Sequence, residues 1–455
     1  MRTKVAIATL ATLALGLTAA CSSPSSGKGG GGKATGGPSS GGASGGQSAA
    51  QKAAAALGID LSKCPTDITK PLTGTVKVGT TLAQTGPIAA ALAPVGVGEK
   101  AAIADLNATS GLPIKFSLTI KDDQFSPDKT LTAVQELIQS DKVDLLDGVI
   151  GTANLIAARG VAEKYCVPII AGSAGGTSAN QVSKYPFTTV TGAPFYLDAE
   201  GWFGYLKEKF PNGAKIALLT ANTDSGKDYL AAVDDLSKGT NFKIVSRTTL
   251  DATAAAAPSS QVTTMRSSGA DVLLAQPSPG PQCAALIKEV AQQGWKPQAF
   301  FITNSCSPTA LVAPAGPAAQ NVLCNLYLND PNSPSAADNP GLQKVLAAIK
   351  KVQPSGPIVG SNLSGYGYIE ILFKAAQQAA QSPLGLSRLG ILYAATHLTY
   401  QPAFLQPGVD YSLDYPKDEV SVESEVLSTF DAKAGQWKTI KVLGYEGQLT
   451  GKASG

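Results

Sequence analysis

The order of apolar and polar positions predicts strands and helices in alternation from Thr75 onward. Thr75 to Leu82 (TVKVGTTL) alternates with the period of two that is typical of a strand. The following segments predict helices over 98–107, 127–140 and 154–165 and strands over 114–120, 144–150 and 167–171. Strands that alternate with helices of this length favour a parallel sheet with right-handed crossovers.

A second series with the same rhythm begins near Gly213. It predicts strands over 214–220, 243–248, 270–275 and 299–303 and helices over 227–237, 259–267 and 283–293. Extended segments over 185–194 and 322–331 are candidate crossovers between the two series. Helices over 341–352 and 366–381 are then expected to return to the first series, and strands over 425–430 and 437–442 to form a hairpin on the second.

The length of this patterned region predicts two lobes. About 400 residues exceed the ~250–300 at which one hydrophobic core stops growing. We therefore expect an α/β protein of two Rossmann-like lobes with parallel sheets. Lobe 1 is predicted over 75–190 plus 328–400, and lobe 2 over 195–322 plus 401–447.

The N-terminus predicts export and a lipid anchor. Arg2 and Lys4 precede an apolar run that is shorter than the roughly 20 residues of a membrane span, as in a signal peptide. LTAAC, ending at Cys21, resembles a bacterial lipobox, although Thr18 stands where Leu is most common. Residues 1–21 are thus a predicted lipoprotein signal peptide, with lipid on Cys21 at the outer face of the cell membrane. The alternative is an ordinary signal peptide with a chance cysteine. Residues 22–60 are predicted to be a flexible Gly/Ser/Ala linker.

Composition argues against several other classes of protein. The net charge is only +3 and no basic stripe is present, so no nucleic-acid partner is expected. Neither a cofactor nor a metal is expected, because no CxxC occurs and His397 is the single histidine.

With Cys21 lipidated, five cysteines remain, so at least one thiol stays free or pairs elsewhere. Cys306 is expected to bridge either Cys283 or Cys324, which are near it in sequence.

The succession of motifs resembles the extracellular substrate-binding proteins of branched-chain amino-acid ABC importers, which have the periplasmic-binding-protein type I fold. The resemblance spans roughly residues 75 to 445. It is carried by VGTTLAQTGPIA with GEKAAIADLN, by KDDQFSPDKTLTAVQELIQSDKVDLLDGVIG, by ANLIAARGVAEKYCVPIIAGSA, and by IKEVAQQGWKP before AFFITN. It implies two lobes joined by a three-crossover hinge that closes on a small ligand, with permease subunits of an ABC importer as partners.

Ligands of open parallel sheets bind beyond the carboxyl ends of the strands, which selects particular loops. In the first lobe, Thr152 and Ser173 precede predicted helices, where hydroxyl and N–H groups favour a carboxylate. Plain N-capping is the alternative role of both residues. The resemblance implies that these loops hold the ligand's carboxylate, together with their neighbours Ala153, Asn154, Gly172 and Ala174, and it adds Gln84 and Thr85. TGP at Thr85 is also a good turn by itself.

The second lobe departs from the family's pattern. Amino-acid binders commonly place an acid after the strand that here reads ADVLLAQ, but the following loop is PSPGPQC. A buried ammonium without a counter-charge is costly, so either another acid substitutes or the ligand has no ammonium. Asp224 is the candidate substitute, or else it caps its helix, and Ser225 stands where the family often has a tyrosine. Ser278 is the remaining candidate in this lobe.

These features predict a lipid-anchored solute-binding receptor rather than an enzyme. Its ligand is expected to be an amino acid, an amide or a carboxylate. A ligand-sensing lipoprotein of the same fold is one alternative. The other is a secreted serine hydrolase with Ser173 as nucleophile and His397 as base. GVGEKA at Gly96 matches a dinucleotide-binding motif in letters, but it lies too far from its strand to hold a pyrophosphate.

Overall fold

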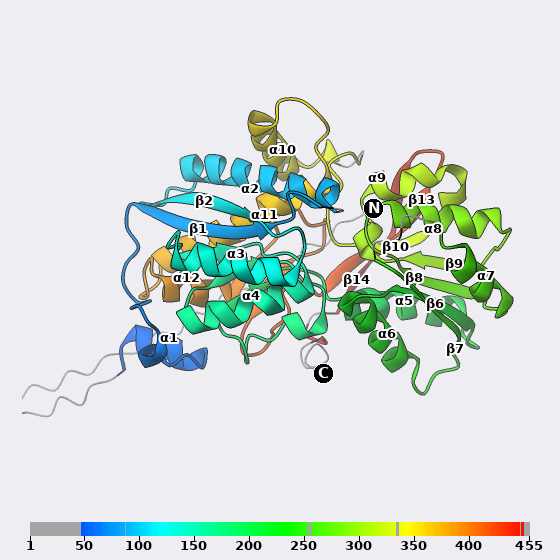
Figure 1. Ribbon diagram of the computed structural model, residues 1–455, viewed down its shortest axis with the longest axis horizontal. Coiled ribbons are helices and arrows are strands. Elements are labelled where there is room, and N and C mark those ends of the chain that lie inside the picture. The colour runs from blue at the N-terminus through cyan, green and yellow to red at the C-terminus, as the bar shows by residue number, and fades with distance from the viewer. Residues whose placement is uncertain are drawn as a thin grey trace, which may run out of the picture. The chain divides into compact units, whose positions relative to one another are not determined.

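The computed structural model describes residues 47–86, 88–252, 254, 257–333, 336–445 and 447–449, and the backbone but not the side chain of Thr177 (Figure 1). Cys21 and the predicted signal peptide therefore lie outside the described residues. Within the described ranges, no helix is both long enough and apolar enough to span a membrane.

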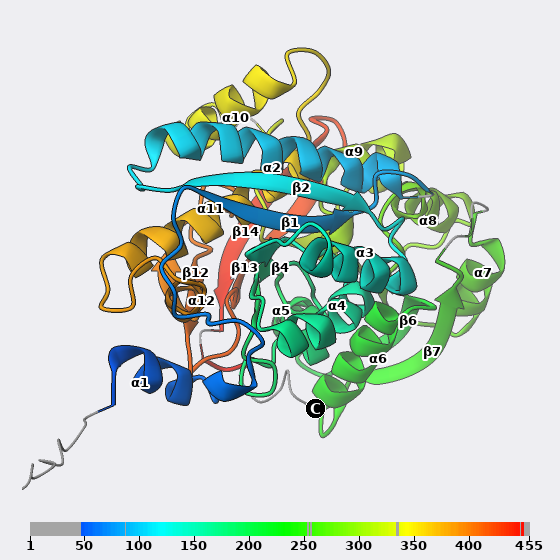
Figure 2. The same cartoon turned by 60° about the vertical axis from the view of Figure 1, so that its left-hand side comes forward.

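The first lobe is built on a parallel five-stranded sheet in the order β2-β1-β3-β4-β5. Its strands are β1 (Thr75–Leu82), β2 (Lys115–Asp122), β3 (Leu145–Asp147), β4 (Ile169–Gly172) and β5 (Thr188–Val190). Helices α3 (Pro127–Gln139) and α4 (Thr152–Tyr165) cover one face, while α2 (Ala89–Thr109) and α11 (Gly360–Ala380) cover the other (Figures 1 and 2). Consecutive residues of β3 point to opposite faces of the sheet, because Leu145 and Leu146 pack into different hydrophobic clusters.

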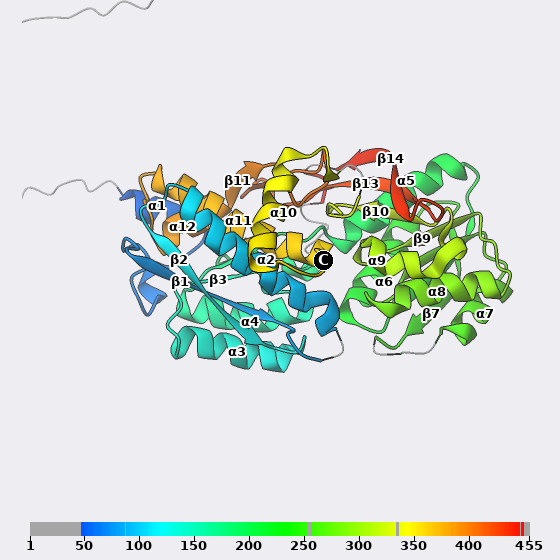
Figure 3. The same ribbon diagram turned by 90° about the horizontal axis from the view of Figure 1, so that it is seen from above.

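The second lobe is a seven-stranded sheet in the order β14-β13-β10-β9-β8-β6-β7. Its parallel strands are β6 (Lys215–Ala221), β7 (Lys243–Leu250), β8 (Val272–Gln276), β9 (Ala299–Ile302) and β10 (Leu323–Leu326). The predicted terminal hairpin is present as antiparallel β13 (Ser424–Asp431) and β14 (Gln436–Gly444). The helices of this lobe include α5 (Phe195–Lys209), α6 (Asp224–Ser237), α7 (Ser259–Ser267), α8 (Pro281–Gln292) and the short α9 (Thr309–Val312). Figure 3 shows this sheet and its helices beside the first lobe.

Helices α10 (Pro340–Val352) and α11 pack on α2 of the first lobe, to which they were expected to return. Two glycines let α11 approach α2 closely: a Cβ on Gly98 would lie 1.9 Å from the carbonyl oxygen of Asn362, and one on Gly365 would lie 2.0 Å from that of Val95. Gly98 of the GVGEKA segment is thus a packing residue inside a helix.

Two predicted boundaries are wrong. Residues 48–56 do not belong to a flexible linker, because α1 (Ala49–Ala56) starts with a capping box at Ser48 and buries Ala53 and Ala54. Residues 401–414 do not belong to the second lobe. Strand β12 (Tyr411–Asp414) pairs with β11 (His397–Tyr400), which follows α12 (Arg388–Ala395), and the Phe404 ring lies against Gly367 of α11.

Two disulfides join the described cysteines. Cys283–Cys306 is one of the two predicted pairings. Cys64–Cys166, which was not predicted, joins the segment before β1 to the C-terminal end of α4 across 102 residues. Cys324 is a buried free thiol.

Candidate functional site

Four loops meet at the carboxyl edge of the first-lobe sheet, one after each of β1 to β4. Backbone hydrogen bonds tie the third loop to the fourth, since Gly151 N donates to the Ser173 carbonyl at 2.8 Å and Ser173 N to that of Val149 at 2.8 Å. The second loop contributes Phe125, whose ring lies 2.8 Å from where a Cβ on Gly151 would be. Phe125 has a positive φ of 59° and is 42% exposed, so an aromatic ring borders the predicted carboxylate loop.

Thr152 and Ser173 do not cap helices. Thr152 is the first residue of α4 after the N-cap residue Gly151, and its Oγ1 accepts a hydrogen bond from Gly176 N at 3.0 Å. The Ser173 hydroxyl accepts from the Tyr368 hydroxyl at 2.9 Å. Because each oxygen already accepts a hydrogen bond, its own hydrogen remains for donation to another acceptor, which suits an anion.

The neighbouring candidates have structural roles. Asn154 is buried and its Nδ2 donates to the Ile150 carbonyl at 3.0 Å, which fixes the turn before α4. Ala153 is the second residue of that helix. Gly172 is the last residue of β4. Ala174 is buried and its backbone packs against Gly192, because a Cβ on Gly192 would lie 2.6 Å from the Ala174 carbonyl oxygen.

Gln84 and Thr85 form a turn held by Asp122. Their backbone N–H groups donate to Asp122 Oδ1 at 2.9 and 3.3 Å, and the Thr85 hydroxyl donates to Oδ2 at 2.5 Å. The Thr85 side chain is therefore engaged with Asp122.

In the second lobe the predicted residues face solvent or their own loop. Asp224 is exposed and pairs with Lys227 at 2.9 Å, while the N-cap of α6 is Thr223, whose hydroxyl accepts from Gly226 N. Ser225 is half-buried in the first turn of α6. Ser278 is half-buried and donates its backbone N–H to Gln282 Oε1 at 3.0 Å.

The acid that reaches the first lobe is Asp228, which was not predicted. A Cβ on Gly176 would lie 2.7 Å from Asp228 Oδ2 and 2.7 Å from Thr152 Oγ1, so the carboxylate on α6 lies beside the Thr152 loop. The signal in the sequence was its spacing of four residues from Asp224, which places both acids on neighbouring turns of α6.

An aromatic pair lies beside the same loop. Phe195 N donates to the Gly175 carbonyl at 2.7 Å, and the Phe195 ring stacks on Tyr229 with centroids 4.9 Å apart. The Tyr229 hydroxyl donates to Asp198, which is fully buried. Burial raises the pKa of Asp198 to about 6. Hydrogen bonds from Tyr229 and Asn304 limit this rise, because they favour the charged form of the carboxyl group.

The hydrolase pairing is not present. His397 Nδ1 contacts the Tyr393 carbonyl at 2.8 Å and Thr396 Oγ1 at 3.0 Å, and its ring stacks on Tyr393. Ser173 contacts Tyr368 instead.

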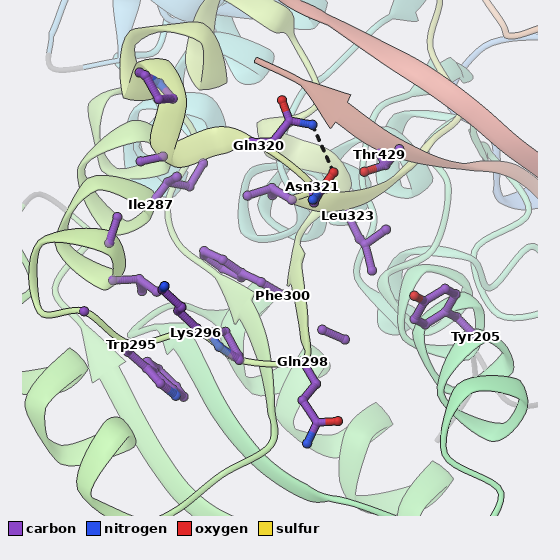
Figure 4. A pocket seen from close by; sticks show the side chains of 18 of the residues that line it. Tyr205, Ile287, Trp295, Lys296, Gln298, Phe300, Gln320, Asn321, Leu323 and Thr429 are labelled. Atoms are coloured by element: carbon purple, nitrogen blue, oxygen red, sulfur yellow. Dashed lines mark hydrogen bonds between the residues drawn. The ribbon is translucent and has the colours of Figure 1, made fainter. Parts of the chain in front are cut away.

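A cavity of about 730 Å³ opens at the opposite edge of the second-lobe sheet, at the starts of β9 and β10 (Figure 4). Phe300, Tyr205 and Trp295 line it with Lys296 and Asn321. Because it lies at the amino ends of these strands, it is separate from the loops described above.

Comparison with known proteins agrees with this architecture. The family model of the periplasmic binding proteins matches residues 75–412. A search of curated protein sequences found no match. Among solved structures, a solute-binding protein of an ABC transporter from R. palustris, in complex with 4-hydroxybenzoate, is 17% identical with a TM-score of 0.68 over 83% of this chain and 99% of that one.

Two further structures are similar. A fatty acid ABC transporter substrate-binding protein from Thermomonospora curvata is 20% identical with a TM-score of 0.68, over 83% of this chain and 96% of that one. A leucine-binding protein from Thermotoga maritima is 17% identical with a TM-score of 0.62, over 81% and 99%. Since the family model covers most of the chain, this protein belongs to the periplasmic binding protein family.

Proposed function

We propose that this protein is the lipid-anchored receptor of an ABC importer, and that it captures a small ligand carrying both an anionic or carbonyl end and a hydrogen-bond donor. The observation that carries the proposal is the opposition of two kinds of groups. Thr152 and Ser173 offer hydroxyl hydrogens on the first lobe, and Asp228 of α6 faces the same loop with a carboxylate.

Asp228 changes the ligand class that is favoured. The PSPGPQC loop supplies no acid, but Asp228 would meet a ligand ammonium or amide beside the carboxylate loop. A zwitterionic amino acid satisfies both sides, and Phe125 and Phe195 offer apolar surface to its side chain. An aromatic carboxylate without an ammonium is the second candidate, supported by the same rings and by the ligand of the R. palustris protein.

A thermal-shift screen of the mature chain with Cys21→Ser tests this proposal. A ligand at 100 times its Kd stabilises the folded state by about 2.7 kcal/mol. We expect amino acids or aromatic carboxylates to raise the Tm, and a screen in which neither class does so would refute the proposal.

Substitutions then identify the ligand class. Ser173→Ala should weaken either class by about 1.5–3 kcal/mol, because a hydrogen bond to a charged group is lost. Asp228→Asn should weaken an amino acid by at least about 2 kcal/mol, and it should not weaken a benzoate. Asp224→Asn is the matched control, because this exposed acid lies on the same helix and pairs with Lys227. Equal effects of the two aspartate substitutions would contradict the role given to Asp228.

A further inference from the structure

Two buried acids behind the first-lobe loops have no hydrogen-bond partner among the described atoms. Glu99 of α2 and Asp147 at the end of β3 are both 0% exposed, and all four of their carboxylate oxygens are unpartnered. The hydroxyl of Thr80 on β1, which is also fully buried, lies close enough to Glu99 to favour its charged form. Buried polar groups in native proteins are nearly always satisfied, so these carboxyl groups call for an explanation.

The acids lie directly behind the candidate ligand loops. A Cβ on Gly148, which has a φ of 59°, would lie 3.1 Å from Glu99 Oε1 and 3.1 Å from the Tyr368 ring. Gly148 begins the loop that leads to Thr152, and the Tyr368 hydroxyl donates to Ser173. Glu99 and Tyr368 therefore contact one loop directly, and Tyr368 extends the contact to the other.

Neither acid forms a salt bridge within the part of the chain that the structure describes. Burial raises the pKa of Glu99 to about 8, against the Thr80 hydroxyl and the charge of Lys100, which both favour its charged form. Burial, and then the charge of Glu99, raises the pKa of Asp147. The remaining titratable groups near the pair are tyrosines with raised pKa values: Tyr368 on α11, Tyr400 on β11 and Tyr411 on β12.

We propose that Glu99 and Asp147 form a proton-dependent lock on the two first-lobe ligand loops, with Gly148 and Tyr368 as its contacts. With both carboxyl groups protonated, the loops keep the arrangement described above. When the pair loses a proton, a charge without a partner is left in the interior, and the structure relieves it by opening the loop at Gly148 to water. The Tyr368–Ser173 hydrogen bond, together with the two backbone hydrogen bonds between the loops, then carries the opening to the second loop. The lock acts without any ligand, so its test does not depend on the proposed function.

Hydrogen–deuterium exchange of the mature chain tests the lock, with labelling times scaled for the intrinsic pH dependence of exchange. In the wild type, segments 148–154 and 172–176 should exchange about tenfold faster at pH 9 than at pH 7, because the protonated fraction of a group with a pKa of about 8 falls about tenfold. Segment 221–227 of the second lobe is the internal control and should not change.

Three variants make the test specific. The double variant Glu99→Gln/Asp147→Asn should make exchange of both segments independent of pH, and Glu99→Gln alone should reduce the pH response. Tyr368→Phe should keep the pH response of 148–154 and weaken that of 172–176, because the backbone hydrogen bonds of Ser173 to Val149 and Gly151 still link the two loops. The proposal is overturned if wild-type exchange shows no extra acceleration, if the double variant Glu99→Gln/Asp147→Asn retains it, or if segment 221–227 accelerates equally.

Discussion

Replacing Glu99 by Gln should stabilise the protein, and by an amount that depends on pH. An unfolded Glu has a pKa of 4.5, and burial raises it to about 8 in the folded protein. The folded state therefore holds a proton that the unfolded state releases, and wild-type stability falls as the pH rises from 4.5 to 8. At 1.36 kcal/mol per pKa unit, the cost is about 3 kcal/mol at pH 7 and reaches about 5 kcal/mol above pH 8. Glutamine carries no proton to lose and has nearly the same shape.

Urea unfolding of wild type and Glu99→Gln between pH 4.5 and 8.5 measures this difference. The variant should be more stable by about 3 kcal/mol at pH 7, and the gain should vanish near pH 4.5. Glu136→Gln is the control, because Glu136 is half-exposed and pairs with Lys121 at 3.4 Å; it should change stability by less than about 1 kcal/mol at any pH. A difference between wild type and Glu99→Gln that is the same at pH 4.5 and pH 7 would show that Glu99 is not held protonated by burial.

Three shorter predictions follow from other features. Removing Cys64–Cys166 by a double Ala substitution should cost about 4.7 kcal/mol in calorimetry, because the disulfide closes a loop of about 100 residues; an unchanged Tm would refute the pairing. Gly98→Ala should lower the Tm, because the new Cβ would collide with the backbone of α11. Gly160→Ala in α4 has open space around it and should raise the free energy of unfolding by up to about 1 kcal/mol. Equal effects of the two substitutions would contradict the close approach of α2 and α11. Cys21→Ser should release the exported protein into the medium, and a protein that stays with the membrane fraction would argue against lipidation at this residue.

The fold was predictable where one periodicity dominates. Strand β1 was predicted over Thr75–Leu82 and has those bounds. Alternating apolar and polar positions with several β-branched residues favour a strand over a helix. Helix α2 was predicted only from Gly98, yet it begins at Ala89. Pro94 and two glycines lower helix propensity in its first half, and close packing against α11 outweighs that cost.

The N-terminal helix shows the opposite error. Residues 49–56 were assigned to a linker on their small, simple composition, although alanine is the best helix former. The capping box between Ser48 and Gln51 was the local signal that this segment is ordered. An eight-residue helix is not stable by itself, and the burial of Ala53 and Ala54 against the rest of the protein supplies the missing stabilisation.

At the candidate site, the rule that ligands lie beyond the strands' carboxyl ends selected loops that lie together in the structure but could not select side chains. It placed Thr152 and Ser173 on loops that are hydrogen-bonded to each other. It missed Phe125, because only the folded chain brings the ring against Gly151. The rule also could not identify Tyr368, because this residue is 195 residues from Ser173 in sequence.

The loop sequence of the second lobe does not reveal Asp228, for a geometric reason. Among the loop residues that directly follow β6, β8 and β9, Asp224 is the single acid, and it is exposed and paired with Lys227. The first turns of α6 follow the same strand end, however, and a residue one turn further along a helix faces nearly the same direction. Asp228 uses that position and lies beside Thr152. A lobe whose PSPGPQC loop is uncharged can therefore still place a carboxylate beside the first-lobe loops, which keeps an ammonium-bearing ligand among the proposed classes.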